Sequence, residues 1–372
     1  MNEQLEAVRG RERLRVLCGG AIIAVLISTL WPFNPFPRNR VSWLTGAKGI
    51  RFDGTGLVVS KSPLGAEETE ARESCSLELL LRPASTESMY TILSFYTPDN
   101  PRQFLVRQWT DGLLVSHDVI DAQSKAKTTK FDVDHAFHRG KLLLVTIASG
   151  PNGTAVYLDG QQARAFPRFK ISRSDLLGQI VMGTSPVDYQ PWPGEVLGLA
   201  IYSKELAHAD ALRHFRDWTD PGVHSPDLDR AISRYAFTEM AGREIHNEVV
   251  SRPDLEIPTS FSVPHKVLLE SPVKEFKADW RYVNDVLLNV AGFVPLGFIV
   301  CAYLACTKSR QTAVLQTILA GGILSFVIEV LQAYIPRRGS GTTDIITNSL
   351  GSALGALLAQ PSVVHRVLRR MK

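Results

Sequence analysis

Four stretches of the sequence are long and apolar enough to cross a lipid bilayer as helices. Residues 16–36, 286–307 and 345–364 carry no charge, and residues 312–335 carry only Glu329. The hydrocarbon core of a bilayer needs about 20 mostly apolar residues for one helix. The sequence therefore predicts a membrane α-helical bundle of four transmembrane helices, which the multi-pass chain enters at residue 16.

The first stretch reads as a retained anchor rather than as a cleaved signal peptide. A cleaved signal ends in small residues of the A-x-A type. This apolar run instead ends in Trp31-Pro32-Phe33, which are bulky residues suited to the membrane interface.

The basic residues predict the orientation of the helices. Cytoplasmic loops and tails carry an excess of Lys and Arg. With the N-terminus and C-terminus inside a bacterial inner membrane, ten basic residues lie in the cytoplasm and residues 38–281 lie outside; the ten are Arg9, Arg11, Arg13, Arg15, Lys308, Arg310, Arg366, Arg369, Arg370 and Lys372. Only Arg337 and Arg338, between the third and fourth helices, oppose this rule.

The extracytoplasmic segment has the sequence pattern of an all-β domain. Ser76–Arg82 alternates as a half-buried strand does, while Asn152-Gly153 and Asp159-Gly160 are hairpin and turn signals. Only residues 208–218 have helical spacing. The expected organisation is a cytoplasmic arm (1–15), a first helix (16–36), a β sandwich (37–220), a strand and connector (221–281), helices two to four (282–360) and a basic tail (361–372).

Several segments of this domain resemble the laminin-G-like, concanavalin-A-like jelly roll. They are residues 76–83, 141–147, the hairpin Ala155–Gly160 (AVYLDG) and Gly194–Leu206 (GEVLGLAIYSKEL). The resemblance implies a jelly-roll sandwich of a kind that often binds glycans or proteins. Glucanases with this fold use an E-x-D-x-x-E strand, which this sequence lacks, so no catalytic residue is assigned. Trp109, Tyr189 and Trp192 are candidates for stacking on sugar rings, although aromatic residues in a sandwich more often belong to the core.

Composition excludes other classes of function. The net charge of +4 is small, and no basic patch interleaved with aromatics indicates nucleic acid. The four cysteines and the histidines have no metal-ligand spacing, so we expect no cofactor and no metal centre. Asp53, Asp99, Asp111 and Asp188 could contribute to a calcium site in the sandwich, but no dense acidic loop converges and turn chemistry explains them better.

Polar residues recur near the outer ends of the last three helices. Such residues are costly within a membrane and usually face partners or a cavity. Asp285 and Asn289 share one helix face, as do Glu329 and Gln332; Arg337 and Arg338 precede Asp344, which has Asn348 one turn later. These eight residues could converge on one polar site, or they could simply hydrogen-bond neighbouring helices. Gly351 and Gly355 form a G-x-x-x-G packing surface.

This pattern resembles the VanZ-like family, named for a protein linked to teicoplanin resistance. The matching residues are Asn289, Phe293, Pro295–Phe298, Glu329, Gln332, Arg337, Arg338, Asp344, Asn348 and Gly351. The family's biochemical activity is poorly defined, so the resemblance implies a location and a site more than a reaction. The large insertion after the first helix departs from simpler members.

Three hypotheses follow for function. In the first, the chain is a non-enzymatic envelope protein that binds a glycan or protein outside and a lipid-linked or amphiphilic partner in the bundle. In the second, Glu329 and Asp344 form an acid–base site acting on a lipid-linked envelope precursor. In the third, the chain is a structural scaffold of an envelope assembly.

Overall fold

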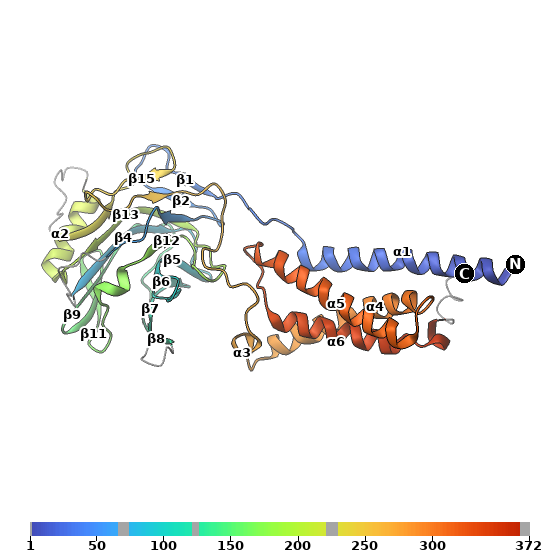
Figure 1. The fold of residues 1–372 in the computed structure, drawn as a ribbon. Coiled ribbons are helices and arrows are strands. Elements are labelled where there is room, and N and C mark those ends of the chain that lie inside the picture. Colours follow the sequence, from blue (N-terminus) through green and yellow to red (C-terminus); the bar gives the residue numbers. More distant parts are fainter. Residues whose placement is uncertain (1, 66–73, 121–125, 221–229, 365–372) are drawn as a thin grey trace. The chain divides into compact units, whose positions relative to one another are not determined.

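The computed structural model describes residues 2–65, 74–120, 126–220 and 230–364, which divide into two compact units. We call Phe36–Lys266 the β unit; Met1–Pro35 and Val267–Lys372 together form the helical unit. Figure 1 shows the strands of the first and the long helices of the second. The basic tail residues Arg366, Arg369, Arg370 and Lys372 lie outside the described residues.

The described part of the β unit consists of two antiparallel eight-stranded sheets. The first has the order β1-β2-β13-β4-β9-β10-β11, with β14 on β13, and the second the order β15-β16-β3-β12-β5-β6-β7-β8. The strands of the first sheet are β1 (Val41–Trp43), β2 (Ile50–Phe52), β4 (Cys75–Pro83), β9 (Leu143–Gly150), β10 (Gly153–Leu158), β11 (Gln161–Phe166), β13 (Gly194–Tyr202) and β14 (Ala231–Tyr235). Those of the second are β3 (Val58–Ser60), β5 (Met89–Tyr96), β6 (Phe104–Trp109), β7 (Gly112–Ile120), β8 (Ala126–Val133), β12 (Gln179–Met182), β15 (Glu244–Ile245) and β16 (Leu255–Glu256).

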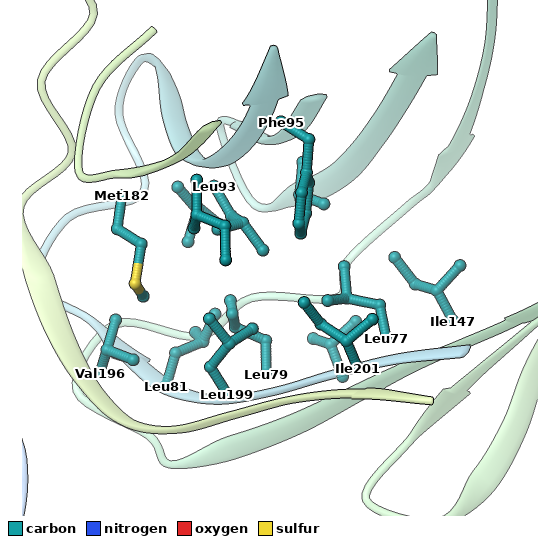
Figure 2. Close-up of a cluster of buried hydrophobic side chains, with 14 of the residues drawn as sticks. Leu77, Leu79, Leu81, Leu93, Phe95, Ile147, Met182, Val196, Leu199 and Ile201 are labelled. Atoms are coloured by element: carbon teal, nitrogen blue, oxygen red, sulfur yellow. The ribbon is translucent and has the colours of Figure 1, made fainter. Parts of the chain in front are cut away.

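The two sheets enclose one apolar core. Side chains alternate across a strand, so Leu77, Leu79 and Leu81 of β4 all point to the same face. Figure 2 shows these three leucines opposite Leu93 and Phe95 of β5. Met182 of β12 lies on the same side of the core as Leu93. Each such side chain stabilises the fold by about 1.5–3 kcal/mol when fully buried. The predicted all-β sandwich is therefore confirmed.

Local signals in the sequence match the turns and the helix of this unit. Asp159 and Gly160 have φ values of 51° and 77°, the left-handed conformation that a two-residue hairpin turn requires. The helix α2 (His208–Thr219) covers the residues expected to be helical. Residues 231–256 contribute β14 to one sheet and β15 and β16 to the other, so the end of this segment completes the sandwich.

The helical unit contains α1 (Asn2–Leu30), α3 (Pro272–Glu275), α4 (Trp280–Leu304), α5 (Arg310–Ala333) and α6 (Thr342–Leu358). Three helices in the described residues are long and apolar enough to cross a membrane, namely Val8–Leu30, Trp280–Leu304 and Arg310–Ala333. The fourth, α6, has 17 residues and is shorter than the expected stretch 345–364. The four-helix membrane topology therefore stays a prediction. Residues 2–15 are helical and continuous with the rest of α1.

Glycines bring α4 and α6 into backbone contact. A side chain added at Gly351 would meet the Val290 carbonyl and lie 2.9 Å from Phe293 Cβ. One added at Gly355 would lie 2.7 Å from the Phe298 nitrogen. The predicted G-x-x-x-G surface thus packs against α4.

Candidate functional site

A polar cluster joins α5 and α6 in the helical unit. Glu329 of α5 is buried, and its Oε2 accepts a hydrogen bond of 2.7 Å from the Gly341 N–H. The side chain of Asp344 on α6 lies close to this carboxyl group. Two acidic side chains thus lie together where α5 and α6 meet.

Amide side chains extend this cluster to a third helix. Asn289 of α4 donates to Asp344 Oδ1 at 2.7 Å. Asn348, one turn after Asp344, donates to Ser325 Oγ of α5 at 2.8 Å. The Oδ1 atom of buried Asn348 has no hydrogen-bond partner within the described part of the chain. Four of the predicted polar residues, Asn289, Glu329, Asp344 and Asn348, are thus brought together.

The other four predicted residues lie elsewhere in the helical unit. Gln332 donates from Nε2 to the Thr29 carbonyl at 3.0 Å, and Arg338 donates from Nη2 to the Trp31 carbonyl at 3.2 Å. Both contacts are with the end of α1. Asp285 is exposed on α4, and Arg337 is exposed after α5. The predicted convergence is therefore partial.

A third carboxylate, which the sequence reasoning missed, lies at the start of α6. Glu275 of the short helix α3 accepts at Oε2 from the Thr343 N–H at 3.0 Å and from Thr343 Oγ1 at 2.5 Å. A carboxylate is stabilised at a helix N-terminus by the unpaired N–H groups and the helix dipole. In the sequence, Glu275 is marked only by its position shortly before an apolar stretch. Hydrophobic periodicity does not predict that it contacts a helix some 70 residues later.

The β unit has a separate hollow beside the turn that joins β6 and β7. Its volume is about 220 Å³, and its lining consists of Trp109, Thr110, Asp111, Gly112, Leu113, Leu114, Asp132 and Asp134. Trp109 is 55% exposed, which is unusual for a residue with a large apolar ring. Thr110 adopts a φ of 52° in the tight turn that exposes the indole.

Two lining residues of this hollow, Leu114 and Asp132, are paired across β7 and β8 of the second sheet. Arg107 of β6 is paired with Leu114 of β7, which is paired with Asp132 of β8. These residues alternate with core residues such as Val106, so their side chains point away from the core. Among the described residues nothing bonds to Arg107 Nε or to buried Ser116 Oγ on the same face. Two buried polar atoms near Trp109 thus lack a hydrogen-bond partner among the described residues.

An ion pair borders the hollow. His135 Nδ1 lies 2.5 Å from Asp111 Oδ2. This hydrogen bond lowers the pKa of Asp111 and raises the pKa of His135 from their ordinary values. Protonated His135 and ionised Asp111 therefore stabilise each other below the pKa of His135, and this stabilisation is lost as the pH rises through it.

The remaining predicted residues of the β unit have other surroundings. Trp192 is fully buried and donates its indole N–H to Gln108 Oε1 at 2.8 Å, so it belongs to the core and presents no stacking face. The Tyr189 ring packs edge-on against Phe261. Trp109 is thus the stacking candidate that lines a hollow.

The acidic residues considered for calcium do not form one cluster. Asp111 pairs with His135, while Asp188 pairs with Arg102 at 3.2 Å. Asp53 and Asp99 are exposed elsewhere. A calcium site in the sandwich stays a prediction.

One group with the spacing of metal ligands occurs in the described residues, formed by Glu244, His246 and Asp254. Lys61 Nζ lies 2.9 Å from Glu244 and 3.9 Å from Asp254. The hydrogen bond that Lys61 donates to Glu244 raises the pKa of Lys61, so the ammonium group already supplies the positive charge here.

Comparison with known proteins identifies the C-terminal part of the chain. The family model described as VanZ/LLP1 matches residues 237–365, which include β15, β16 and α3–α6. The VanZ-like resemblance predicted from the sequence is thereby confirmed. No curated protein matches the chain.

Comparison with solved structures gives matches of low identity and low TM-score, three of which are described next. A Bacteroides ovatus protein described as a candidate carbohydrate-binding protein has 11% identity and a TM-score of 0.40, over 59% of this chain and 62% of that one. The receptor-binding domain of botulinum neurotoxin D has 18% identity and a TM-score of 0.35, over 48% and 46%. A pentraxin of Limulus polyphemus has 13% identity and a TM-score of 0.36, over 61% and 95%. The chain thus spans less than two thirds of the length of the Bacteroides ovatus protein and of the neurotoxin domain.

Proposed function

We propose that this chain is a membrane-anchored envelope protein whose β unit binds a saccharide in the hollow beside Trp109. The observation that carries this proposal is an exposed indole in a hollow that also contains three carboxylates, Asp111, Asp132 and Asp134. Ligand sites in proteins combine apolar contact with a few polar groups that fix orientation. A sugar ring offers C–H groups to the indole face and hydroxyl donors to the carboxylates.

The charge of the hollow favours a particular class of saccharide. Carboxylates repel acidic sugars such as uronic acids, because like charges held close together destabilise each other. Neutral hydroxyls donate to carboxylates, and the ammonium group of an amino sugar pairs with them. We therefore expect a neutral or amino saccharide of the envelope rather than an acidic one.

Trp109→Ala is expected to weaken saccharide binding at least about 30-fold, which corresponds to about 2 kcal/mol for loss of a buried aromatic anchor. The measurement is binding of the full chain in lipid nanodiscs to an array of neutral, amino and acidic envelope saccharides. Met240→Ala is the matched control, because Met240 is 57% exposed on the β unit and does not line the hollow. Equal binding by the two variants would overturn the proposal.

In the same account the helical unit holds the polar group of a lipid-linked or amphiphilic partner beside Glu329 and Asp344. Support comes from the buried Glu329 carboxyl group beside half-buried Asp344, and from Asn348 Oδ1, which has no hydrogen-bond partner among the described residues. Buried polar groups inside a membrane are costly and usually mark a partner or a pathway. The basic residues of the N-terminal arm orient the chain with its β unit outside the cytoplasmic membrane.

Glu329→Gln tests this second site. An amide keeps the size of the side chain, can still accept from the Gly341 N–H and can donate to Asp344, so a purely structural role survives. We expect unchanged thermal stability but an altered set of co-purified lipids in native mass spectrometry. Asp285→Asn, at an exposed acid of α4, is the control and should leave the lipids unchanged. An identical lipid profile for Glu329→Gln and the wild-type chain would favour the scaffold hypothesis.

A further inference from the structure

Residues 267–281, which lead into α4 and include its first two residues, expose large apolar side chains. Val273 is 87% exposed, Phe276 63% and Trp280 76%. Val267 and Leu268 are also among the exposed apolar residues. So much exposed apolar surface in a short segment indicates that something other than water covers it.

The exposed charges that accompany these residues are mostly basic. Lys274, Lys277 and Arg281 each directly follow an exposed apolar residue, and all three are exposed. Of the acids, Glu270 and Glu275 are half-buried, whereas Asp279 is exposed and accepts from the Tyr282 N–H at 2.8 Å. The exposed surface is therefore apolar with a net positive charge.

Chain continuity places this surface at a bilayer boundary. Trp280 is the first residue of α4, which is one of the helices able to cross a membrane. Aromatic and basic residues at the end of a membrane helix lie at the level of the lipid headgroups. An apolar surface interleaved with Lys and Arg fits the boundary of headgroups and acyl chains in an anionic bilayer.

We infer that residues 267–281 lie in the headgroup layer of the membrane, with Val273, Phe276 and Trp280 inserted toward the acyl chains and the three basic residues on lipid phosphates. The same segment is tied to the start of α6. The backbone carbonyl of Glu270 accepts from the Thr342 N–H at 2.9 Å, and the Leu269 N–H donates to Ser340 Oγ at 3.2 Å. Lipid contact by this segment thus fixes the loop that donates to Glu329.

Fluorescent labels on introduced cysteines test the inference. Val273→Cys and Phe276→Cys are made in a full chain whose native Cys18, Cys75, Cys301 and Cys306 are replaced by alanine, labelled with an environment-sensitive dye and reconstituted into phosphatidylcholine–phosphatidylglycerol vesicles. We expect a nitroxide lipid to quench most of the emission at both positions and aqueous iodide to quench little. Val250→Cys is the matched control, since Val250 is 88% exposed in the β unit and should respond to iodide. Iodide quenching of position 273 equal to that of position 250 would contradict the inference.

A second measurement needs no label. Hydrogen–deuterium exchange of the wild-type chain is compared in vesicles of phosphatidylglycerol and of phosphatidylcholine alone. The amides of residues 272–279 should exchange several-fold more slowly in the anionic vesicles, and Lys274→Glu with Lys277→Glu should remove this difference. Equal exchange in both kinds of vesicle would exclude recognition of anionic headgroups.

Discussion

Replacing Glu78 by alanine is expected to lower the free energy of unfolding of the β unit by about 3–5 kcal/mol. Glu78 of β4 is fully buried between the first sheet and α2. His214 Nδ1 and Trp218 Nε1 lie 3.0 Å from its carboxylate, Tyr202 OH lies 3.2 Å away and Thr146 Oγ1 lies 3.3 Å away. Alanine would remove the carboxylate acceptor that four buried side chains share, and each hydrogen bond lost to a charged group costs about 1.5–3 kcal/mol.

Urea denaturation of the isolated β unit, followed by tryptophan fluorescence, measures this effect. The unit has its own core and is compact by itself. Glu244→Ala is the control, because Glu244 is an exposed partner of Lys61 and such a pair contributes at most about 1 kcal/mol. If both variants lost the same small amount of stability, Glu78 would not be holding α2 on the sheet.

Gly351→Leu is expected to destabilise the helical unit by about 3 kcal/mol, at the upper end of the usual cost of overpacking. The new side chain would collide with the Val290 carbonyl and with Phe293 of α4. A backbone carbonyl cannot move aside as a flexible side chain can, so α4 and α6 must separate. Separation would also pull Asn289 away from Asp344.

Thermal unfolding of the detergent-purified chain, detected by fluorescence size exclusion, measures the loss. Gly292→Leu provides the control, since Gly292 lies on α4 with open space around its α-carbon. We expect a lower melting temperature for Gly351→Leu alone. A similar melting temperature for the two variants would show that α4 and α6 do not touch at Gly351.

The fold could largely be predicted from the sequence because its two units follow different periodicities. Long apolar stretches predicted α1, α4 and α5, and alternation predicted strands such as β4. The last helix was expected to end at residue 360, and α6 ends at Leu358; hydropathy alone does not set where a helix ends. The pairing of β14 with β13 and of β16 with β3 joins segments distant in sequence, which local patterns do not encode.

Some features of the candidate sites could be predicted from residue spacing, and others depend on how the elements pack. Helical spacing placed Asp344 and Asn348 on one face, and they do lie with Asn289 and Glu329. Spacing could not show that Gln332 and Arg338 contact the end of α1, because that depends on how the helices pack. Similarly, Trp109 and Trp192 are the same residue type, and only the strand geometry makes one exposed and the other buried.

Binding of a saccharide beside Trp109 is the central claim, and the indole N–H signals of the β unit test it most directly. The ¹⁵N-labelled β unit is titrated with the best ligand from the saccharide array while the Trp109 and Trp192 indole signals are followed by NMR. We predict a saturable shift of the Trp109 signal and none at Trp192, whose indole is buried on Gln108. Saturable binding that leaves the Trp109 signal unmoved would contradict the account.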